Sequence, residues 1–324
     1  MLLAVFFCIP LFSCGDGIRP IKASKEELRT VAKILGEEVK YDEIRYLAYS
    51  YKLDMAMRLG EDIWNDPSEE HLAELREKIE NVLLENAALI SYYDEYDIDM
   101  DSSEVENTVN SYINEFAEEI GEREEYKKYL EENYLTDRYL RYILSIELCR
   151  ETLRTELLKD GSIDASDETF ESVVKSDEFA RTLHVYIGND AGDDIEENRK
   201  LAEKVVSLLD SGEPMTRMIG RYSEDVYMTT TDGYYFMRGE YEKAYEDTAF
   251  SLGIGEYSGV VEGEKCFYVI MRLEKEDDYI NRNFETLKDQ YIYVMLDRLL
   301  DEKKADAEID YTEFGKGLDL SALN

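Results

Sequence analysis

The spacing of apolar residues changes once along this chain, and that change restricts the possible folds more than any other feature. Between residues 41 and 159, apolar side chains such as Ile44, Leu47 and Met55 recur every three or four positions, as in amphipathic helices. After Ser176, short strand-like runs alternate with short helical patterns in the order β-α-α-β-α-β-β. The sequence therefore predicts an α+β protein with a mostly helical lobe and a smaller domain of strands and helices.

Capping signals and prolines mark where the predicted helices begin and end. The first helix should end near residues 65–67, and Ser68 should cap the next one, which has Glu in its first turn. The chain has only four prolines, which suits long helices because proline removes a helical hydrogen bond. The remaining predicted helices of this lobe cover residues 101–121, 122–134 and 136–159.

The two ends of the chain carry further strand and helix patterns. Residues 30–40 read as a small β-hairpin around Gly36. A long helix is predicted again over residues 283–303, and the tail from residue 307 to 314 fits one more strand. We expect this tail to pair with the hairpin, so that both chain ends build the helical lobe and the second domain is inserted into it.

The charge of the chain restricts its partners. Its 324 residues carry 75 acidic and 37 basic side chains, which gives a net charge of −38. Such a surface repels phosphate backbones, so we exclude nucleic-acid binding and expect neutral or cationic partners. The sequence contains no signal for the oligomeric state.

Few side chains are available for metal or thiol chemistry. Two histidines are too few for a His-rich metal site, and no CxxC pair occurs, so we predict neither a metal nor a cofactor. Cys149 and Cys266 are expected to be buried free thiols. The spaced aspartates of residues 97–106 resemble a calcium loop, but Ser102 and Thr108 stand where an EF-hand needs Gly and Glu. We therefore interpret this segment as a helix cap.

The N-terminus reads as a targeting segment. Residues 2–12 are apolar but too few to cross a bilayer, which needs about 20 residues. The sequence Leu-Phe-Ser-Cys that follows, ending at Cys14, resembles the lipobox of bacterial lipoproteins, although no Lys or Arg precedes it. The resemblance implies a signal peptide over residues 1–13, a lipidated Cys14 with a tether to residue 29, and anchoring to the outer face of a bacterial cell membrane. The alternative is a buried N-terminal strand.

Residues 179–275 carry four motifs that together resemble a parvulin-type peptidyl-prolyl isomerase. LHVYI resembles the first strand of that family, and GRYSEDVYMTTTDGYYFMRGE resembles its YS-x-D/C and GGDLG-x-F segments. YEKAYEDTAFSLGIGEYSGVVE and KCFYVIMRLEK resemble the helix and the last strand that follow. The resemblance implies an antiparallel sheet with helices over residues 176–277. The layout of residues 30–175 and 278–324 resembles the chaperone lobe of PrsA/SurA-type secreted foldases.

The resemblance also assigns site residues. His184 takes the place of the first-strand histidine, and Asp225 takes the Cys/Asp position. Tyr268 stands where the family usually has a second histidine, and we expect its hydroxyl to link His184 to Asp225. The positions of the proline pocket are Phe236, Tyr241 and Tyr245.

The sequence departs from the family at several of these positions. Tyr replaces His at 268, Tyr241 replaces Met or Leu, and Gly233 either replaces a Leu or marks a one-residue shift. Tyr234 and Tyr235 alternate along a strand, so only one of them can face the groove. The loop at residues 187–198 has no basic residue, which argues against a preference for phosphorylated Ser-Pro or Thr-Pro.

Two functions follow from these features. The first is an extracytoplasmic foldase that isomerises X–Pro bonds in unfolded or extended secreted polypeptides that are not phosphorylated. The alternative is a non-catalytic chaperone or peptide-binding lipoprotein whose parvulin domain has lost turnover. Each residue singled out above also has a structural reading: His184 as an ordinary strand histidine, Asp225 as a loop carboxylate, and the aromatic side chains as core.

Overall fold

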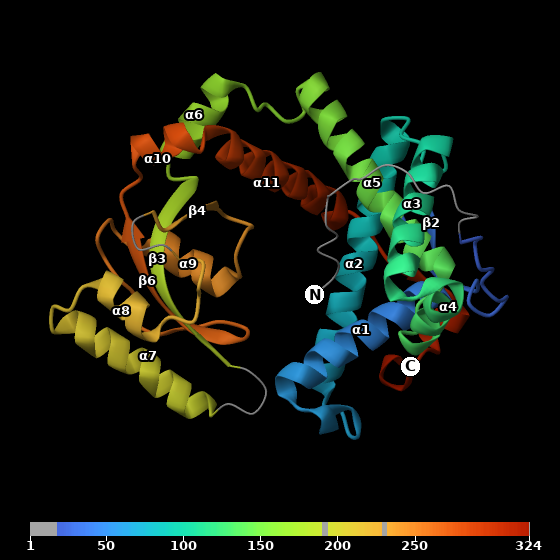
Figure 1. Ribbon diagram of the computed structural model, residues 1–324, viewed down its shortest axis with the longest axis horizontal. Helices are drawn as coiled ribbons and strands as arrows, with labels where there is room; N and C mark the ends of the chain where they lie inside the picture. The colour runs from blue at the N-terminus through green and yellow to red at the C-terminus, as the bar shows by residue number, and fades with distance from the viewer. Residues whose placement is uncertain (1–17, 190–193, 229–231, 324) are drawn as a thin grey trace.

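The computed structural model of the protein describes residues 18–189, 194–228 and 232–323, and it places them in two lobes (Figure 1). The segment carrying Cys14 and the predicted signal peptide lies outside the described residues. The fold is α+β, as predicted. In the described part of the chain, no helix combines the length and apolar character needed to span a bilayer.

The larger lobe is helical and begins and ends with short strands. Its first part consists of β1 (Thr30–Ile34), β2 (Glu37–Lys40), α1 (Tyr41–Leu59), η1 (Glu61–Trp64), α2 (Glu69–Glu95), α3 (Ser103–Ile120), α4 (Glu122–Glu132) and α5 (Asp137–Asp160). Its last part consists of α11 (Phe284–Ala305), β7 (Asp310–Tyr311), α12 (Glu313–Lys316) and η2 (Leu320–Ala322). Two short helices, α6 (Asp167–Lys175) and α10 (Asp277–Arg282), connect this lobe to the smaller one and pack against the smaller sheet (Figure 1). The short helices α6 and α10 were not predicted.

Side-chain caps fix the starts of three long helices. The side chains of Ser68, Ser102 and Thr136 each accept a hydrogen bond from a backbone N–H three residues later. The cap at Ser102 confirms that residues 97–106 lead into a helix. The predicted end of the first helix was wrong, because α1 stops at Leu59. Gly60 follows with φ of 107°, a conformation that ends the helix, and the 3₁₀ turn η1 comes next.

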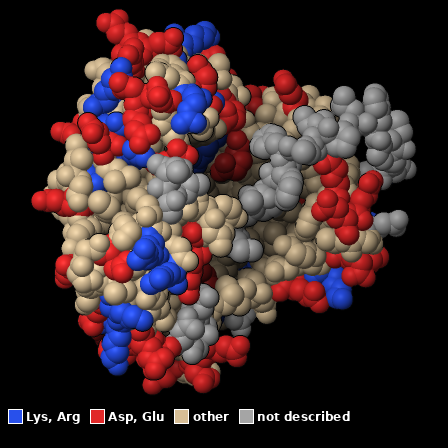
Figure 2. Space-filling view, turned by 60° about the vertical axis from the view of Figure 1, so that its left-hand side comes forward, with Lys and Arg blue, Asp and Glu red and all other residues tan. Residues whose placement is uncertain are grey.

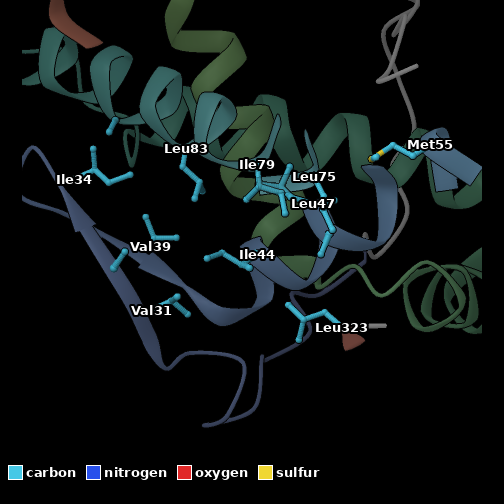
Figure 3. Close-up of a cluster of buried hydrophobic side chains, with 13 residues drawn as sticks. Val31, Ile34, Val39, Ile44, Leu47, Met55, Leu75, Ile79, Leu83 and Leu323 are labelled. Atoms are coloured by element: carbon cyan, nitrogen blue, oxygen red, sulfur yellow. The ribbon is translucent and has the colours of Figure 1, made fainter. Parts of the chain in front are cut away.

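The chain ends meet in one sheet, as predicted. The order is β2-β1-β7, and Ala32 of β1 is paired with Tyr311 of β7. Behind this sheet, apolar side chains from the hairpin, α1, α2 and the C-terminal segment form one core (Figure 3). The labelled members are Val31, Ile34, Val39, Ile44, Leu47, Met55, Leu75, Ile79, Leu83 and Leu323.

A buried charged cluster connects α1 to α5. Arg138 donates to both carboxylate oxygens of Asp42 and to Glu43, at 2.7 to 2.8 Å. Thr136 also donates to Asp42, at 2.6 Å. Both carboxyl groups are buried, and the positive charge of the Arg138 guanidinium offsets part of the cost of burying them.

The smaller lobe is a four-stranded antiparallel sheet with helices on both faces. Its elements are β3 (Phe179–Gly188), α7 (Ile195–Asp210), α8 (Met215–Tyr222), β4 (Tyr234–Met237), α9 (Lys243–Ser251), β5 (Val261–Glu262) and β6 (Cys266–Leu273), and the strand order is β4-β3-β6-β5. Side chains alternate along β3. Leu183, Val185 and Ile187 pack with α7 and α8, whereas Ala180 packs on the opposite face with α9. Cys149 and Cys266 are buried free thiols, as expected.

Three kinds of contact join the lobes. Helix α11 extends from the helical lobe to the sheet, where Leu287 and Tyr291 pack with Phe179 and Met237 (Figure 1). Tyr235 of β4 stacks on Tyr279 of α10 with ring centroids 4.3 Å apart. An ion pair of 2.9 Å connects Lys265, just before β6, to Asp54 of α1. Acidic side chains spread over much of the face seen in Figure 2, in keeping with the net charge of −38.

Candidate active site

The site lies on the α9 face of the smaller sheet, and its centre is His184. This residue is in the middle of β3, and its side chain is only 3% exposed. Its Nε2 lies 3.0 Å from Asp225 Oδ2, and its Nδ1 lies 2.9 Å from the hydroxyl of Tyr245. Both ring nitrogens therefore have protein partners.

The loop after α8 carries Asp225 to His184. This loop lies along β3: the N–H of Glu224 donates to the carbonyl of Tyr186, and the N–H of Tyr186 donates to the hydroxyl of Ser223. Asp225 accepts from the N–H of Tyr227 at 2.9 Å and from the hydroxyl of Tyr234 at 2.8 Å.

These hydrogen bonds keep Asp225 ionised. Burial alone would raise the pKa of this carboxyl. The bonds from the Tyr227 N–H, the Tyr234 hydroxyl and His184 outweigh burial and lower the pKa. The carboxylate is therefore charged at neutral pH.

His184 is neutral at the same pH. Burial disfavours the imidazolium form and lowers the pKa of His184 to about 4, although the charge of Asp225 acts in the opposite direction. Because an ionised carboxylate only accepts, Nε2 of His184 carries the proton and donates it to Asp225. Nδ1 is then the acceptor.

The hydroxyl of Tyr245 completes the network. Tyr245 belongs to α9 and is fully buried, with its hydroxyl 2.7 Å from Thr182 Oγ1 and 2.9 Å from His184 Nδ1. Burial raises the pKa of Tyr245 well above its ordinary range, so the hydroxyl keeps its proton. The bonds therefore form a chain in which Thr182 donates to Tyr245 and Tyr245 donates to Nδ1.

The aromatic side chains predicted for the proline pocket are next to this network. The ring centroids of Phe236 and Tyr241 are 4.8 Å apart, those of Tyr241 and Tyr245 are 4.9 Å apart, and those of Tyr245 and Tyr268 are 5.0 Å apart. All six predicted site residues that lie in the described part of the chain are therefore brought together. Phe236 and Tyr245 are fully buried, so the reachable wall consists of the partly exposed Tyr234, Tyr241 and Tyr268.

The expected link from Tyr268 to Asp225 was wrong. The Tyr268 ring faces His184 edge-on at 5.5 Å between centroids. Its hydroxyl interacts with Cys266 and Glu242. Burial is the main cause of the raised pKa of Tyr268, and these two groups raise it further. The hydroxyl that contacts His184 comes from Tyr245, and the hydroxyl that contacts Asp225 comes from Tyr234.

Sequence reasoning did not identify Thr182 or assign a role to Tyr234. The alternation along β4 showed that one of Tyr234 and Tyr235 faces the groove, and the structure shows that it is Tyr234. Gly233, just before β4, explains the close approach of the strands. A Cβ there would lie 2.4 Å from the carbonyl oxygen of Thr182, and φ is 67°.

The arrangement suits chemistry without bond cleavage. Burial raises the pKa of the Cys266 thiol to about 12, so it is a poor nucleophile. Within residues 18–189, 194–228 and 232–323, no three or more His, Cys, Asp or Glu side chains are grouped to hold a metal ion. The site offers a carboxylate, a neutral imidazole and aromatic rings with hydroxyl groups.

Comparisons with known proteins find family matches in two separate segments of the chain. Residues 1–154 match the family described as SurA-like N-terminal domain, and residues 170–276 match the PPIC-type PPIase domain. Foldase protein PrsA of Geobacillus sp. (strain WCH70) is 25% identical over 115 residues, which are 35% of this chain and 41% of that protein. Peptidyl-prolyl cis-trans isomerase pin1 of Schizosaccharomyces pombe is 40% identical over 79 residues, 24% of this chain and 45% of that protein.

Solved structures include similar chains. The foldase protein PrsA from Streptococcus pneumoniae aligns with a TM-score of 0.35 and 15% identity, over 89% of this chain and 87% of that chain. The chain spans less than half the length of the curated relatives described above.

Proposed function

We propose that this protein is an extracytoplasmic foldase. The chain combines a SurA-like N-terminal domain with a PPIC-type, parvulin-like PPIase domain, and it is related to PrsA foldases. In this proposal it catalyses cis–trans isomerisation of X–Pro bonds in secreted client chains that are not phosphorylated. The observation that carries the proposal is the pairing of His184 with Asp225 beside a wall of tyrosines, inside the segment that matches the PPIase family.

The reaction requires no bond to break. The barrier to rotation about a peptide bond is about 18–20 kcal/mol because the amide loses resonance as it twists. A catalyst must therefore bind the twisted amide better than the planar one. In the twisted state the nitrogen lone pair is no longer shared with the carbonyl, so the nitrogen becomes a better acceptor.

The tyrosine wall supplies an apolar surface for the proline ring and a hydroxyl group that can donate to the twisted amide. The rings of Tyr241 and Tyr268 are apolar faces against which a proline ring can pack. Among the described residues, the Tyr241 hydroxyl has no hydrogen-bond partner, so it remains available to a substrate. The other two accessible hydroxyls are engaged, that of Tyr234 with Asp225 and that of Tyr268 with Cys266 and Glu242.

A protease-coupled assay on the full chain with an X–Pro tetrapeptide tests the proposal. Wild-type protein should accelerate isomerisation, and His184→Ala and Asp225→Ala should each reduce kcat/KM. His71→Ala, at the other histidine of the chain on α2, is the matched control and should retain the wild-type rate. A wild-type rate equal to background, with peptide binding retained, would replace the enzyme by the non-catalytic peptide-binding alternative.

The cellular setting is part of the same proposal. The lipobox-like sequence ending at Cys14 supports lipid anchoring at the outer face of a bacterial cell membrane, and the helical lobe would hold unfolded clients. Cys14→Ala should release the protein from the membrane fraction. Retention of that variant in the fraction would contradict the anchor without affecting the proposed isomerase activity.

A further inference from the structure

The hydroxyl of Tyr245 cannot contact a proline ring bound at the tyrosine wall. The side chain is fully buried, so a substrate cannot reach it without displacing the tyrosines in front of it. Tyr241 stacks on its ring with a centroid distance of 4.9 Å and an interplanar angle of 25°. A phenylalanine would fill the same space, and the family pattern M-x-x-x-F-E, which residues 241–246 (YEKAYE) resemble, has Phe at this position.

The hydroxyl does have two partners, and both lie on β3. Thr182 and His184 are two residues apart on the same face of the strand, and the Tyr245 hydroxyl lies between them at 2.7 and 2.9 Å. It connects α9, the helix that follows Tyr241, to the strand that carries the central histidine. Tyr268, at the position of the second family histidine, supplies no such bond.

Only one arrangement of protons satisfies every group in this network. Asp225 accepts from Tyr227, Tyr234 and His184, which requires the proton of His184 on Nε2. Nδ1 then needs a donor, and the Tyr245 hydroxyl is the group at hydrogen-bond distance. Thr182 in turn donates to the Tyr245 oxygen.

We infer that Tyr245 is a positioning residue: its hydroxyl holds His184 in the Nε2–H tautomer and directs that proton at Asp225. This inference rests on the proposed isomerase function for its kinetic consequence but not for its structural one. It also accounts for the two departures from the family pattern together. The chain lacks a histidine at 268 and has gained a hydroxyl at 245, so the support for His184 comes from α9 instead of β6.

Tyr245→Phe isolates the hydroxyl, because the ring stays. Tyr93→Phe is the matched control: Tyr93 is equally buried, in the helical lobe, and its hydroxyl donates to the carbonyl of Ile146 at 2.7 Å. The first readout is the protonation of the imidazole nitrogens of His184, from proton–nitrogen correlation spectra of the full chain. Only two histidines contribute to these spectra. We expect Tyr245→Phe, and not Tyr93→Phe, to alter the signals of His184.

The second readout is kinetic. Loss of one such hydrogen bond should lower kcat/KM for an X–Pro peptide about tenfold in Tyr245→Phe and leave it unchanged in Tyr93→Phe. The double variant Tyr245→Phe/Tyr268→His recreates the family pattern at both positions, and it should recover at least part of the lost rate.

The outcomes separate this inference from the proposed function. Unchanged His184 spectra in Tyr245→Phe, with a loss of stability like that of Tyr93→Phe, would overturn the positioning role and leave Tyr245 a core residue. A wild-type protein without isomerase activity would contradict the proposed function, while the spectra of His184 would still decide whether Tyr245 sets its tautomer.

Discussion

Acidification should destabilise this protein through His184, and the size of the effect follows from the structure. Burial lowers the pKa of this imidazole from 6.5 to about 4. Between about pH 6.5 and pH 4, His184 therefore binds a proton in the unfolded chain but stays mostly neutral in the folded protein. One pKa unit corresponds to about 1.4 kcal/mol, so the full difference is about 3 kcal/mol.

The direction of the effect is fixed by the lowered pKa. The stability that depends on neutral His184 is fully present above pH 6.5 and is lost as the pH falls through about 4. Urea unfolding of the full chain at intervals from pH 7.5 to 4 measures this loss. Comparison with His184→Gln, which has no imidazole, cancels the other titrating groups. The free-energy difference between the two proteins should change by about 3 kcal/mol over this range, to the disadvantage of the wild type.

The same protonation state governs activity. Because His184 stays neutral above its folded pKa, isomerase activity should be independent of pH between about 5 and 8. An NMR titration of the imidazole gives the pKa directly, and His71→Gln controls for the loss of a histidine elsewhere. Titration of His184 near 6.5, or parallel stability curves for wild type and His184→Gln down to pH 4, would refute the reasoning.

Three further predictions concern other parts of the molecule. Burial raises the pKa of Glu43 to about 7, so its stabilising contribution is present below pH 4.5 and is lost as the pH rises toward 7. Because His184 titrates alike in both proteins, the free energy of unfolding of the wild type should fall relative to that of Glu43→Gln between pH 5 and pH 8. Gly233→Ala should lower the free energy of unfolding by about 1–3 kcal/mol in urea titrations, because its Cβ meets the carbonyl of Thr182 and φ is positive. The Glu224 carboxylate, next to Asp225 in the loop after α8, accepts from the N–H of Gly188. Peptides with Lys before proline should thus have kcat/KM up to about fivefold above those with Glu at low salt, and Glu224→Lys should reverse the order.

Local signals were sufficient for most of the architecture. Ser68, Ser102 and Thr136 cap helices because each side chain bonds to a neighbour three residues along, which a sequence pattern records. The strand-like run at residues 179–187 similarly predicted β3. The end of α1 at Gly60 was missed, since the apolar spacing continues beyond it. The six residues of α10 are too few to show a periodicity, whereas α6 was missed although Ser166 caps it and Phe170 and Val174 are at helical spacing.

The site was predictable in its membership but not in its bonds. The family resemblance brought together His184, Asp225 and the aromatic residues, and the structure places them in contact. It assigned the linking hydroxyl to Tyr268, whereas Tyr245 contacts His184 across 61 positions of sequence and Tyr234 contacts Asp225. Sequence spacing shows which face of a strand or helix a tyrosine occupies. It does not show which of several neighbouring hydroxyls reaches a given nitrogen, because that depends on how α9 packs on the sheet.

The position of β4 ties the site to the helical lobe. One face of β4 carries Tyr234 and Phe236 into the site, whereas Tyr235 and Met237 on the other face pack in the cluster that includes Leu287 of α11. Gln290 of α11 also donates to the carbonyl of Tyr235 at 2.9 Å. Burial of each large apolar side chain contributes about 1.5–3 kcal/mol, so α11 contributes substantially to holding this strand. The same helix packs its later turns against α2 of the helical lobe (Figure 1). The wall of the site is therefore supported from outside the segment that matches the PPIase family, and the full chain is the unit in which its geometry is defined.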